Sequence, residues 1–178
     1  MSPGNTNTAE QLSAPVQDVV LRVPTADDGP ALFGLIAACP PLDQNSRYCN
    51  LLQVNHFAQT AVVAELDGDI VGSITGYLKP DDPATLFIWQ VAVDERARGR
   101  RLATRMMDAI VDRRACAGVR YMETTIDPDN AASWRAFEKF ADARDAASEQ
   151  SLLFERDRHF DGVHGDEVLL RIGPFRGR

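Results

Sequence analysis

The sequence predicts one α/β domain of the α+β type, in which a mixed central β-sheet is flanked by helices. Its 178 residues suit one compact domain, and 44% hydrophobic residues is ordinary for a globular chain. Strand-like and helix-like segments alternate, and both a hairpin and helical crossovers join the strands, which favours antiparallel and parallel neighbours in one sheet. Residues 1–18 are polar without an apolar period, so we expect a flexible arm before a domain over residues 19–178.

The first predicted elements precede residue 60. Val19–Val23 has a strand-like composition and predicts a short strand. Thr25, followed by Asp28 three residues later, has the spacing of a capping box and predicts the start of a helix. Pro40-Pro41 would end that helix. A second helix is expected around Leu51–Phe57.

Three strands are predicted next. Ala61–Leu66 and Ile70–Leu78 flank the turn Asp67-Gly68-Asp69, and an Asp-Gly pair between two apolar runs is a strong signal for a β-hairpin. Lys79–Ala84 is expected to form a loop, and Thr85–Val93 the third strand.

In the second half of the chain, helices and strands alternate. Apolar residues recur at helical spacing from Leu102 to Val111, and Gly118 is expected to close that helix near its C-terminus. The remaining predicted elements are a strand over Val119–Ile126, a helix over Asn130–Phe140, and closing strands over Leu152–Phe154 and Val168–Ile172.

The charge balance narrows the possible partners. Lys and Arg number 19 and Asp and Glu number 26, so the net charge is −7. This balance disfavours nucleic acid and anionic membranes and attracts a cationic small-molecule substrate. No apolar run approaches the roughly 18 residues of a membrane span, and the first basic residue, Arg22, lies too late for the charged start of a secretory signal. We therefore expect a soluble cytoplasmic protein.

The cysteines and histidines form no metal or disulfide pattern. The three cysteines, at positions 39, 49 and 116, are odd in number and far apart, and the three histidines, at 56, 159 and 164, are scattered. Because neither spacing fits a zinc site or a disulfide framework, we expect reduced thiols and no metal.

The segment Trp89–Thr104 predicts an anion-binding site. A strand runs into a short loop that opens an amphipathic helix, and five arginines lie between Arg96 and Arg105. Backbone N–H groups at a helix N-terminus are unpaired and suit a phosphate or pyrophosphate, which Gly99 would let approach closely. A solvated arginine-rich face is the alternative. The segment lacks the pattern of a nucleoside-triphosphate loop and the three glycines of a dinucleotide fold.

This loop and a later helix resemble those of the GNAT acetyltransferases. Residues 96–101 (RARGRR) match the acyl-CoA motif of that family, except that its final Gly or Ala is Arg101. Asn130, which opens the later helix, matches a second family feature, although it would also serve as a plain N-cap. The resemblance implies the GNAT fold and acetyl-CoA as co-substrate. The implied cofactor-binding residues are Val91, Ala92, Val93, Arg98, Gly99, Arg100, Arg101, Leu102, Ala103, Thr104 and Asn130.

One departure from the family concerns the leaving group. Many members carry a tyrosine seven residues after that asparagine, where it protonates the departing thiolate. Phe137 occupies this position and has no proton to donate. Tyr121 or a water molecule would serve instead, or the thiolate would leave with little acid help.

Further segments resemble one branch of the family, the enzymes that acetylate the 4-amino group of L-2,4-diaminobutyrate in ectoine synthesis. These segments are Pro41–Cys49, Phe87–Val93, Glu123–Thr125 with Pro128–Ser133, and His164–Leu169. The resemblance implies that small molecule as the acceptor and a homodimer as the assembly.

An acceptor with two ammonium groups and one carboxylate needs acids and at least one hydrogen-bond donor in its pocket. Asp43 and Glu167 are the predicted acids. The alternative is that both simply lie in polar loops at the surface and that Trp89 packs in the core. The predicted substrate-binding residues are Asp43, Asn45, Tyr48, Trp89, His164 and Glu167.

The predicted chemistry is direct acyl transfer. The attacking amine must lose a proton, and Glu123 or Glu167, acting through water, is the predicted general base; a paired structural role is the alternative for Glu123. The backbone N–H of Val91, at a predicted bulge, would hold the oxyanion. Two other functions stay open: acetylation of another amine, such as a polyamine or an aminoglycoside, and a non-catalytic module that binds CoA.

Overall fold

The computed structural model describes residues 18–175, so all but the last residue of the predicted arm lie outside the described residues. The strands are β1 (Val20–Arg22), β2 (Val62–Leu66), β3 (Asp69–Lys79), β4 (Asp82–Val93), β5 (Tyr121–Ile126), β6 (Ser148–Phe154) and β7 (Glu167–Ile172). The α-helices are α1 (Gly29–Ala37), α2 (Arg47–His56), α3 (Leu102–Val111), α4 (Ala131–Ala143) and α5 (Arg156–His159). Short 3-10 turns are η1 (Ala26–Asp28), η2 (Ala58–Thr60), η3 (Glu95–Ala97) and η4 (Arg114–Cys116).

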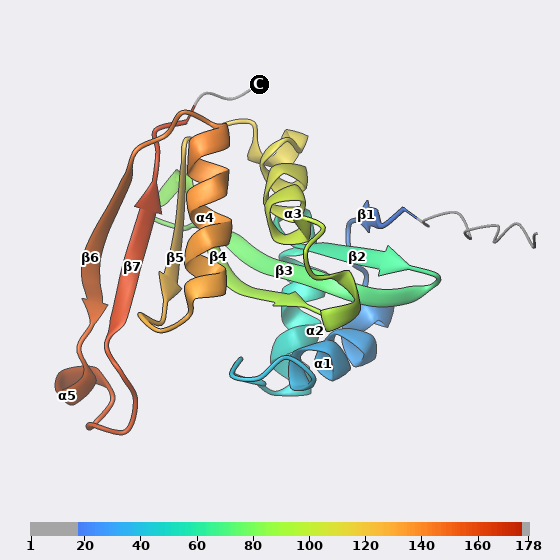
Figure 1. The fold of residues 1–178 in the computed structure, drawn as a ribbon, viewed down its shortest axis with the longest axis horizontal. Helices are drawn as coiled ribbons and strands as arrows, with labels where there is room; N and C mark the ends of the chain where they lie inside the picture. The colour runs from blue at the N-terminus through green and yellow to red at the C-terminus, as the bar shows by residue number, and fades with distance from the viewer. Residues whose placement is uncertain (1–17, 176–178) are drawn as a thin grey trace, which may run out of the picture.

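The strands form one mixed sheet in the order β1-β2-β3-β4-β5-β7-β6. Among the described residues, β4 and β5 are its parallel pair, and every other neighbouring pair is antiparallel. Helices α3 and α4 cover one face, and α1 and α2 lie on the other (Figure 1). This arrangement confirms the predicted mixed sheet flanked by helices.

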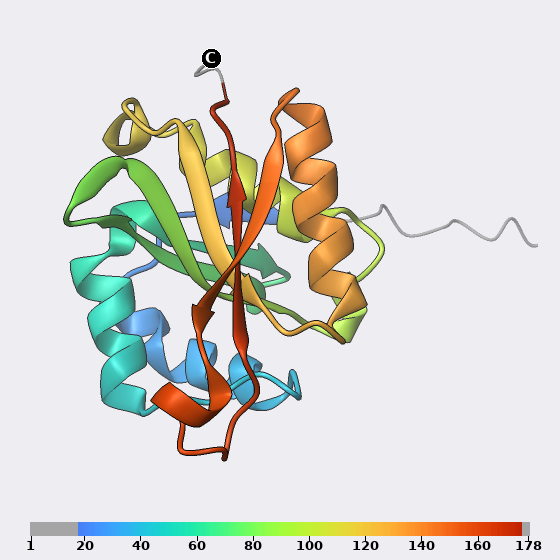
Figure 2. The same ribbon diagram turned by 90° about the vertical axis from the view of Figure 1, so that its left-hand side faces the viewer.

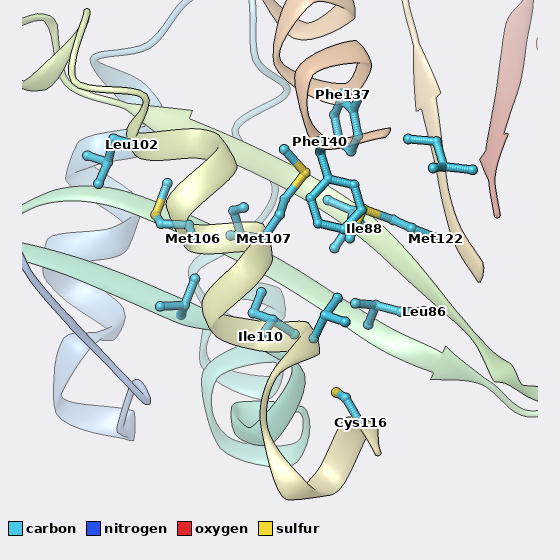
Figure 3. Close-up of a cluster of buried hydrophobic side chains, with 14 of the residues drawn as sticks. Leu86, Ile88, Leu102, Met106, Met107, Ile110, Cys116, Met122, Phe137 and Phe140 are labelled. Carbon is cyan, nitrogen blue, oxygen red and sulfur yellow. The ribbon is translucent and has the colours of Figure 1, made fainter. Parts of the chain in front are cut away.

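The larger hydrophobic core lies between the sheet and the helices α3 and α4. Met106, Met107 and Ile110 of α3 lie over Leu86 and Ile88 of β4, and all five are fully buried (Figure 3). A smaller core joins α1 to the other face; its buried members include Leu32, Ile36 and Ala92. The predicted apolar face of the third helix is therefore confirmed.

Two local signals also held. The Thr25 N–H donates to the Asp28 carboxylate at 2.7 Å, as the capping-box spacing predicts. Asp67 and Gly68 both have positive φ, at 57° and 86°, and join β2 to β3 in the predicted hairpin. Only a few residue types adopt that backbone readily, which is why the Asp-Gly pair is a reliable signal.

Two predictions on helices were wrong, and one short helix was missed. Helix α2 starts at Arg47 rather than near Leu51, because the Ser46 hydroxyl accepts the Cys49 N–H at 3.1 Å and caps a polar first turn that has no apolar signal. Helix α3 ends at Val111, and η4 separates that end from Gly118. The short helix α5 has no apolar period and was not predicted.

Strands β4 and β5 separate halfway along their length, and this opening positions the site. Their parallel register runs from Thr85↔Tyr121 to Ile88↔Thr124 and stops there, and the two strands then diverge toward the start of α4 (Figure 1). On its other side, β4 has a bulge: Gln90 pairs with Thr75 and Ile88 with Gly76, so Trp89 is the extra residue. The bulge predicted at Val91 therefore lies two residues earlier.

Candidate active site

The start of α3 has the local geometry that the predicted anion site requires. Residues 98–104, here named the anion loop, contain two positive φ values, 78° at Gly99 and 55° at Arg101. The N-cap residue Arg101 offers no side-chain acceptor to the first turn. The N–H groups of Leu102, Ala103 and Thr104 belong to that turn, which has no intrahelical partners for them, so they suit an anionic ligand.

A cavity of about 420 Å³ lies against the anion loop, between α3 and α4. It continues into an inner cavity of about 350 Å³, because Val93, Arg98 and Ala103 line both. Small side chains keep this passage open: Ala132 and Ala136 of α4 face it in both cavities. The shape suits a long, narrow ligand with its anionic part at the loop.

Asn130 lines the inner cavity and also caps α4. Its Oδ1 accepts the N–H of Ser133 at 3.1 Å. The N-cap role of Asn130 is therefore confirmed, and the cap fixes the first turn of α4 against the inner cavity. Cofactor binding by Asn130 stays a prediction.

A third cavity, of about 340 Å³, opens where β4 and β5 separate. Val91, Asn130, Ser133 and Phe137 line it together with the inner cavity, so the groove is continuous. Five of the six predicted substrate-binding residues meet here from the α1–α2 loop, β4, the β6–β7 connection and the start of β7: Asp43, Asn45, Trp89, His164 and Glu167. We name this space the acceptor cavity.

Two polar contacts organise the acceptor cavity. Gln90 donates from its side-chain amide to the Asp43 carbonyl at 2.6 Å and holds the α1–α2 loop against β4. The His164 ring lies with Nε2 at 3.9 Å from Glu167 Oε1. Phe160 supports that ring, with centroids 4.8 Å apart. Two carboxylates, an imidazole and an indole therefore surround one space, which suits a cationic amine.

Three predicted residues do not line the groove with their side chains. Tyr48, in the polar first turn of α2, is 70% exposed and lines none of the three cavities. Ala92 points to the opposite face of the sheet and packs in the smaller core, so only its backbone is available to a ligand. Arg100 is exposed and lines none of the three cavities.

Glu123 also lies outside the three cavities. It is 3% exposed, and its carboxylate binds Lys79 Nζ at 3.0 Å and the guanidinium of Arg171. The hydrogen bond that Lys79 donates to the Glu123 carboxylate raises the pKa of Lys79. Arg171 in turn lies over the Tyr121 ring, 3.9 Å from its centroid. Because both of its cation contacts lie within the sheet and it lines none of the three cavities, the geometry favours the paired structural role for Glu123. Tyr121 lines none of the three cavities either.

Sequence reasoning missed several lining residues. Gln90 and Thr125 lie next to predicted positions but carry no charge, and nothing in their pattern marks them. Arg135 and Lys139 line the cavity at the anion loop from α4. Their spacing of four residues, on the side of the helix that carries Ala132 and Ala136, was a signal that could have found them.

The described residues contain neither a metal-binding cluster nor a membrane-spanning helix. Over residues 18–175, no three His, Cys, Asp or Glu side chains gather in a way that could hold a metal ion. In the same range, no helix has the length and apolar character needed to cross a membrane.

The sheet that opens beside a helix N-terminus defines the class of protein. The model of the acetyltransferase (GNAT) family matches residues 30–141, and the chain belongs to that family. It is 48% identical over 158 residues to the L-2,4-diaminobutyric acid acetyltransferase of Methylotuvimicrobium alcaliphilum, and the match covers 89% of this chain and 92% of that protein. It is 46% identical over 166 residues to the enzyme of the same name from Streptomyces coelicolor, covering 92% and 98%.

Solved structures agree with this family. The diaminobutyrate acetyltransferase EctA from Paenibacillus lautus, in complex with its substrate L-2,4-diaminobutyric acid and coenzyme A, has a TM-score of 0.86 to this chain at 40% identity, covering 91% of this chain and 98% of that one. The loading GNATL domain of CurA from Lyngbya majuscula has a TM-score of 0.65 at 16% identity, covering 86% and 96%, and shows the fold alone.

Proposed function

We propose that this protein transfers the acetyl group of acetyl-CoA to the 4-amino group of L-2,4-diaminobutyrate, giving N4-acetyl-L-2,4-diaminobutyrate for ectoine synthesis. The observation that carries the proposal is the acceptor cavity, in which Asp43 and Glu167 meet Trp89 and His164 at the end of the groove that starts at the anion loop. The names of the relatives support the same acceptor.

In this proposal the groove binds acetyl-CoA along its length. The anion loop holds the pyrophosphate through the N–H groups of the first turn of α3. The alanine-lined inner cavity takes the narrow chain that follows. The thioester then reaches the place where β4 leaves β5, and the N–H of Val91 supports the charge that develops on the carbonyl oxygen.

The acceptor is oriented by charge. One carboxylate, Asp43, binds the 2-ammonium group, and the second, Glu167, faces the 4-amino group. Holding the chain at one end presents only the other amine to the thioester, and such orientation lowers a barrier by several kcal/mol. Acetylation at a single nitrogen follows from this arrangement.

Proton transfer is assigned to residues of the acceptor cavity. Glu167, with His164 beside it, takes the proton from the attacking amine directly or through water. Ser133 lines both the inner and acceptor cavities and carries the hydroxyl nearest in sequence to Phe137. We assign to it the donation of a proton to the departing thiolate. No covalent enzyme intermediate is needed.

The proposed assembly is a homodimer in the cytoplasm that serves osmoprotection. Every residue of β6 is exposed, although β6 pairs with β7 and ends the sheet (Figure 2). Leu152 and Phe154 of β6 are 54% and 43% exposed. Because an open apolar edge strand readily pairs with another strand, and a second copy offers an identical one, we place the dimer contact there.

Product analysis tests the proposal. The purified protein is given acetyl-CoA with L-2,4-diaminobutyrate, ornithine, lysine or spermidine, and the products are assigned by NMR. We expect N4-acetyl-L-2,4-diaminobutyrate and no product acetylated at the 2-amino group. Equal or faster turnover of another amine would leave only a general acetyltransferase. Release of no free thiol with any of them would favour the non-catalytic module.

A further inference from the structure

Four buried polar side chains gather where α2 packs against the sheet, beside the acceptor cavity. Asn50 and Gln53 lie on the buried side of α2, which packs against β3. Thr75 of β3 and Gln90 of β4 are cross-strand partners, so their side chains lie on the same face of the sheet. Because Gln90 reaches the α1–α2 loop, this is the face that α2 covers. All four residues are at most 9% exposed, and we name them the α2 polar cluster.

Five side-chain atoms of the α2 polar cluster have no hydrogen-bond partner among the residues that the structure describes. They are Asn50 Nδ2, Asn50 Oδ1, Gln53 Oε1, Thr75 Oγ1 and Gln90 Oε1. Within residues 18–175, every buried side-chain nitrogen or oxygen without a partner belongs to this cluster. Buried polar groups in native proteins are nearly always bonded to the protein or to ordered water. Their concentration in one place therefore indicates a shared ligand.

The chemistry of these atoms defines the ligand. The Asn50 amide nitrogen and the Thr75 hydroxyl can donate hydrogen bonds, and the three amide oxygens can accept them. The cluster itself carries no charged side chain, which disfavours a metal ion or an anion. A small neutral molecule that both donates and accepts is required. Water has this chemistry, and a buried water molecule typically makes about three such bonds.

Gln90 connects the α2 polar cluster to the acceptor cavity. Its amide nitrogen donates to the Asp43 carbonyl, and both residues line that cavity. A donor to the amide oxygen would keep the nitrogen of Gln90 turned toward Asp43, because an amide rotated by half a turn exchanges these two atoms. The Cβ atoms of directly paired strand residues lie about 5 Å apart. A water molecule held by the Thr75 hydroxyl is therefore within reach of Gln90 Oε1.

We propose that the α2 polar cluster binds ordered water that donates to Gln90 Oε1, and that Asn50 and Thr75 are positioning residues for the acceptor. They act through the Gln90 amide on the Asp43 loop. This inference rests on the proposed function, in which Asp43 binds the 2-ammonium group and takes no part in proton transfer. Loss of the cluster should therefore raise the KM for L-2,4-diaminobutyrate and leave kcat nearly constant.

Steady-state kinetics of Thr75 variants test this role. Thr75→Val keeps the shape of the side chain and removes the hydroxyl, so we expect the KM for L-2,4-diaminobutyrate to rise about twofold to fivefold. The kcat and the Kd of CoA should stay within about twofold of the parent. Thr75→Ser restores the hydroxyl and should restore the KM. In a Gln90→Leu background, Thr75→Val should cause no further rise, since the two residues act in series.

Thr85→Val is the matched control for lost stability. Thr85 is another buried threonine of the sheet, and its hydroxyl donates to Asp82 at 2.6 Å, away from the acceptor cavity. This variant should lower Tm and leave the KM unchanged. Asn50→Leu should lower Tm and raise the KM, because it removes bonds to the water. An Asn50→Leu variant with a higher Tm would show that the amide has no partner and would overturn the proposal.

A high-resolution crystal structure of the parent protein completes the test. We expect a water molecule within hydrogen-bond distance of both Thr75 Oγ1 and Gln90 Oε1. A dry cluster, an unchanged KM in Thr75→Val, or additive effects of Thr75→Val and Gln90→Leu would each overturn the proposal. Acetylation of L-2,4-diaminobutyrate by the parent would then leave the proposed function standing. A parent without that activity would overturn the proposed function, and with it the positioning role.

Discussion

The side-chain amide of Gln90 donates a 2.6 Å hydrogen bond to the backbone carbonyl of Asp43, 47 residues earlier in the chain. Gln90 follows the bulge residue of β4, and Asp43 lies in the loop between α1 and α2. The bond thus fixes the α1–α2 loop to β4, the strand that lines the acceptor cavity. The place of the Asp43 carboxylate depends on it.

Gln90→Leu removes this bond and keeps a side chain of similar size. We expect the KM for L-2,4-diaminobutyrate to rise about threefold to tenfold, because one hydrogen bond contributes about 0.5–1.5 kcal/mol. The Kd of CoA should not change. Asp43→Asn should lower kcat/KM about tenfold or more, as expected for the loss of a charge-assisted contact. A Gln90→Leu variant with an unchanged KM would show that other contacts hold the loop.

Substitutions of Glu167 and Glu123 should have different effects, the first on kcat and the second on stability. Glu167→Gln is expected to lower kcat by about 10²-fold or more, the usual scale for a lost general base, with little change in Tm. Glu123→Gln breaks the contacts with Lys79 and Arg171 and should lower the free energy of unfolding by about 2 kcal/mol, a value reduced because both cations are partly exposed. Kinetics and thermal melting of both variants make the comparison. The reverse pattern would return the base role to Glu123.

The proposed role of Ser133 in protonating the thiolate can be tested with two variants. Ser133→Ala should lower kcat several-fold while the KM for acetyl-CoA stays constant, since the hydroxyl acts when the thiolate leaves. Adding Phe137→Tyr places a phenol next to the same cavities and should restore part of the lost rate. If Ser133→Ala has the parent kcat, the thiolate leaves without help from Ser133.

Acid stability depends on Asp28. Hydrogen bonds from Arg22, at 2.8 Å, and from the Thr25 N–H lower the pKa of this carboxyl from its ordinary 3.8. Because the pKa of Asp28 is lower in the folded protein than in the unfolded chain, its ionised carboxylate stabilises the fold at pH values above its ordinary pKa. This stability is lost as the pH falls through the pKa that Asp28 has in the folded protein. Asp28→Asn should therefore cost about 1–2 kcal/mol at pH 7. Urea unfolding of the two proteins should converge in strongly acidic solution; a constant difference would exclude ionisation as the cause.

The exposed strand β6 predicts a dimer that one charge disrupts. Leu152→Glu should convert the dimer to a monomer in sedimentation experiments, because the carboxylate cannot be buried without a partner. Val20→Glu is the control, since Val20 is 60% exposed on β1 at the opposite edge of the sheet. A dimer that persists in Leu152→Glu would place the contact elsewhere.

The order of the strands and long helices along the chain was predictable because each element carries a local signal. The Asp67-Gly68 turn, the apolar stripe of α3 and the Asn130 cap act over a few residues, and the structure has all three. The start of α2 was not predictable in this way, because the first turn of that helix is polar and depends on the Ser46 cap.

The candidate site was predictable in part. Segments 43–45, 89–91 and 164–167 supply residues of the right chemistry, and the fold brings them together. Glu123 could not be sorted from Glu167 in sequence, since its partners Lys79 and Arg171 lie 44 and 48 residues away. The bulge was misplaced for a similar reason: it depends on Gly76, where a Cβ would lie 2.5 Å from the Phe87 carbonyl.

The opening between β4 and β5 has a mechanical consequence. Pairing stops at Ile88 and Thr124, and the contacts of Glu123 with Lys79 and Arg171 tie β3, β5 and β7 together one residue before that point. Strands β4 and β5 are therefore held together up to the point where they separate, and they are not paired with each other beyond it. A ligand that enters the opening would rearrange Val91–Val93 and the end of β5, while the ion-paired part of the strands stays in place. Amide exchange should therefore slow on ligand binding in Val91–Val93 and at the end of β5, and stay constant around Glu123.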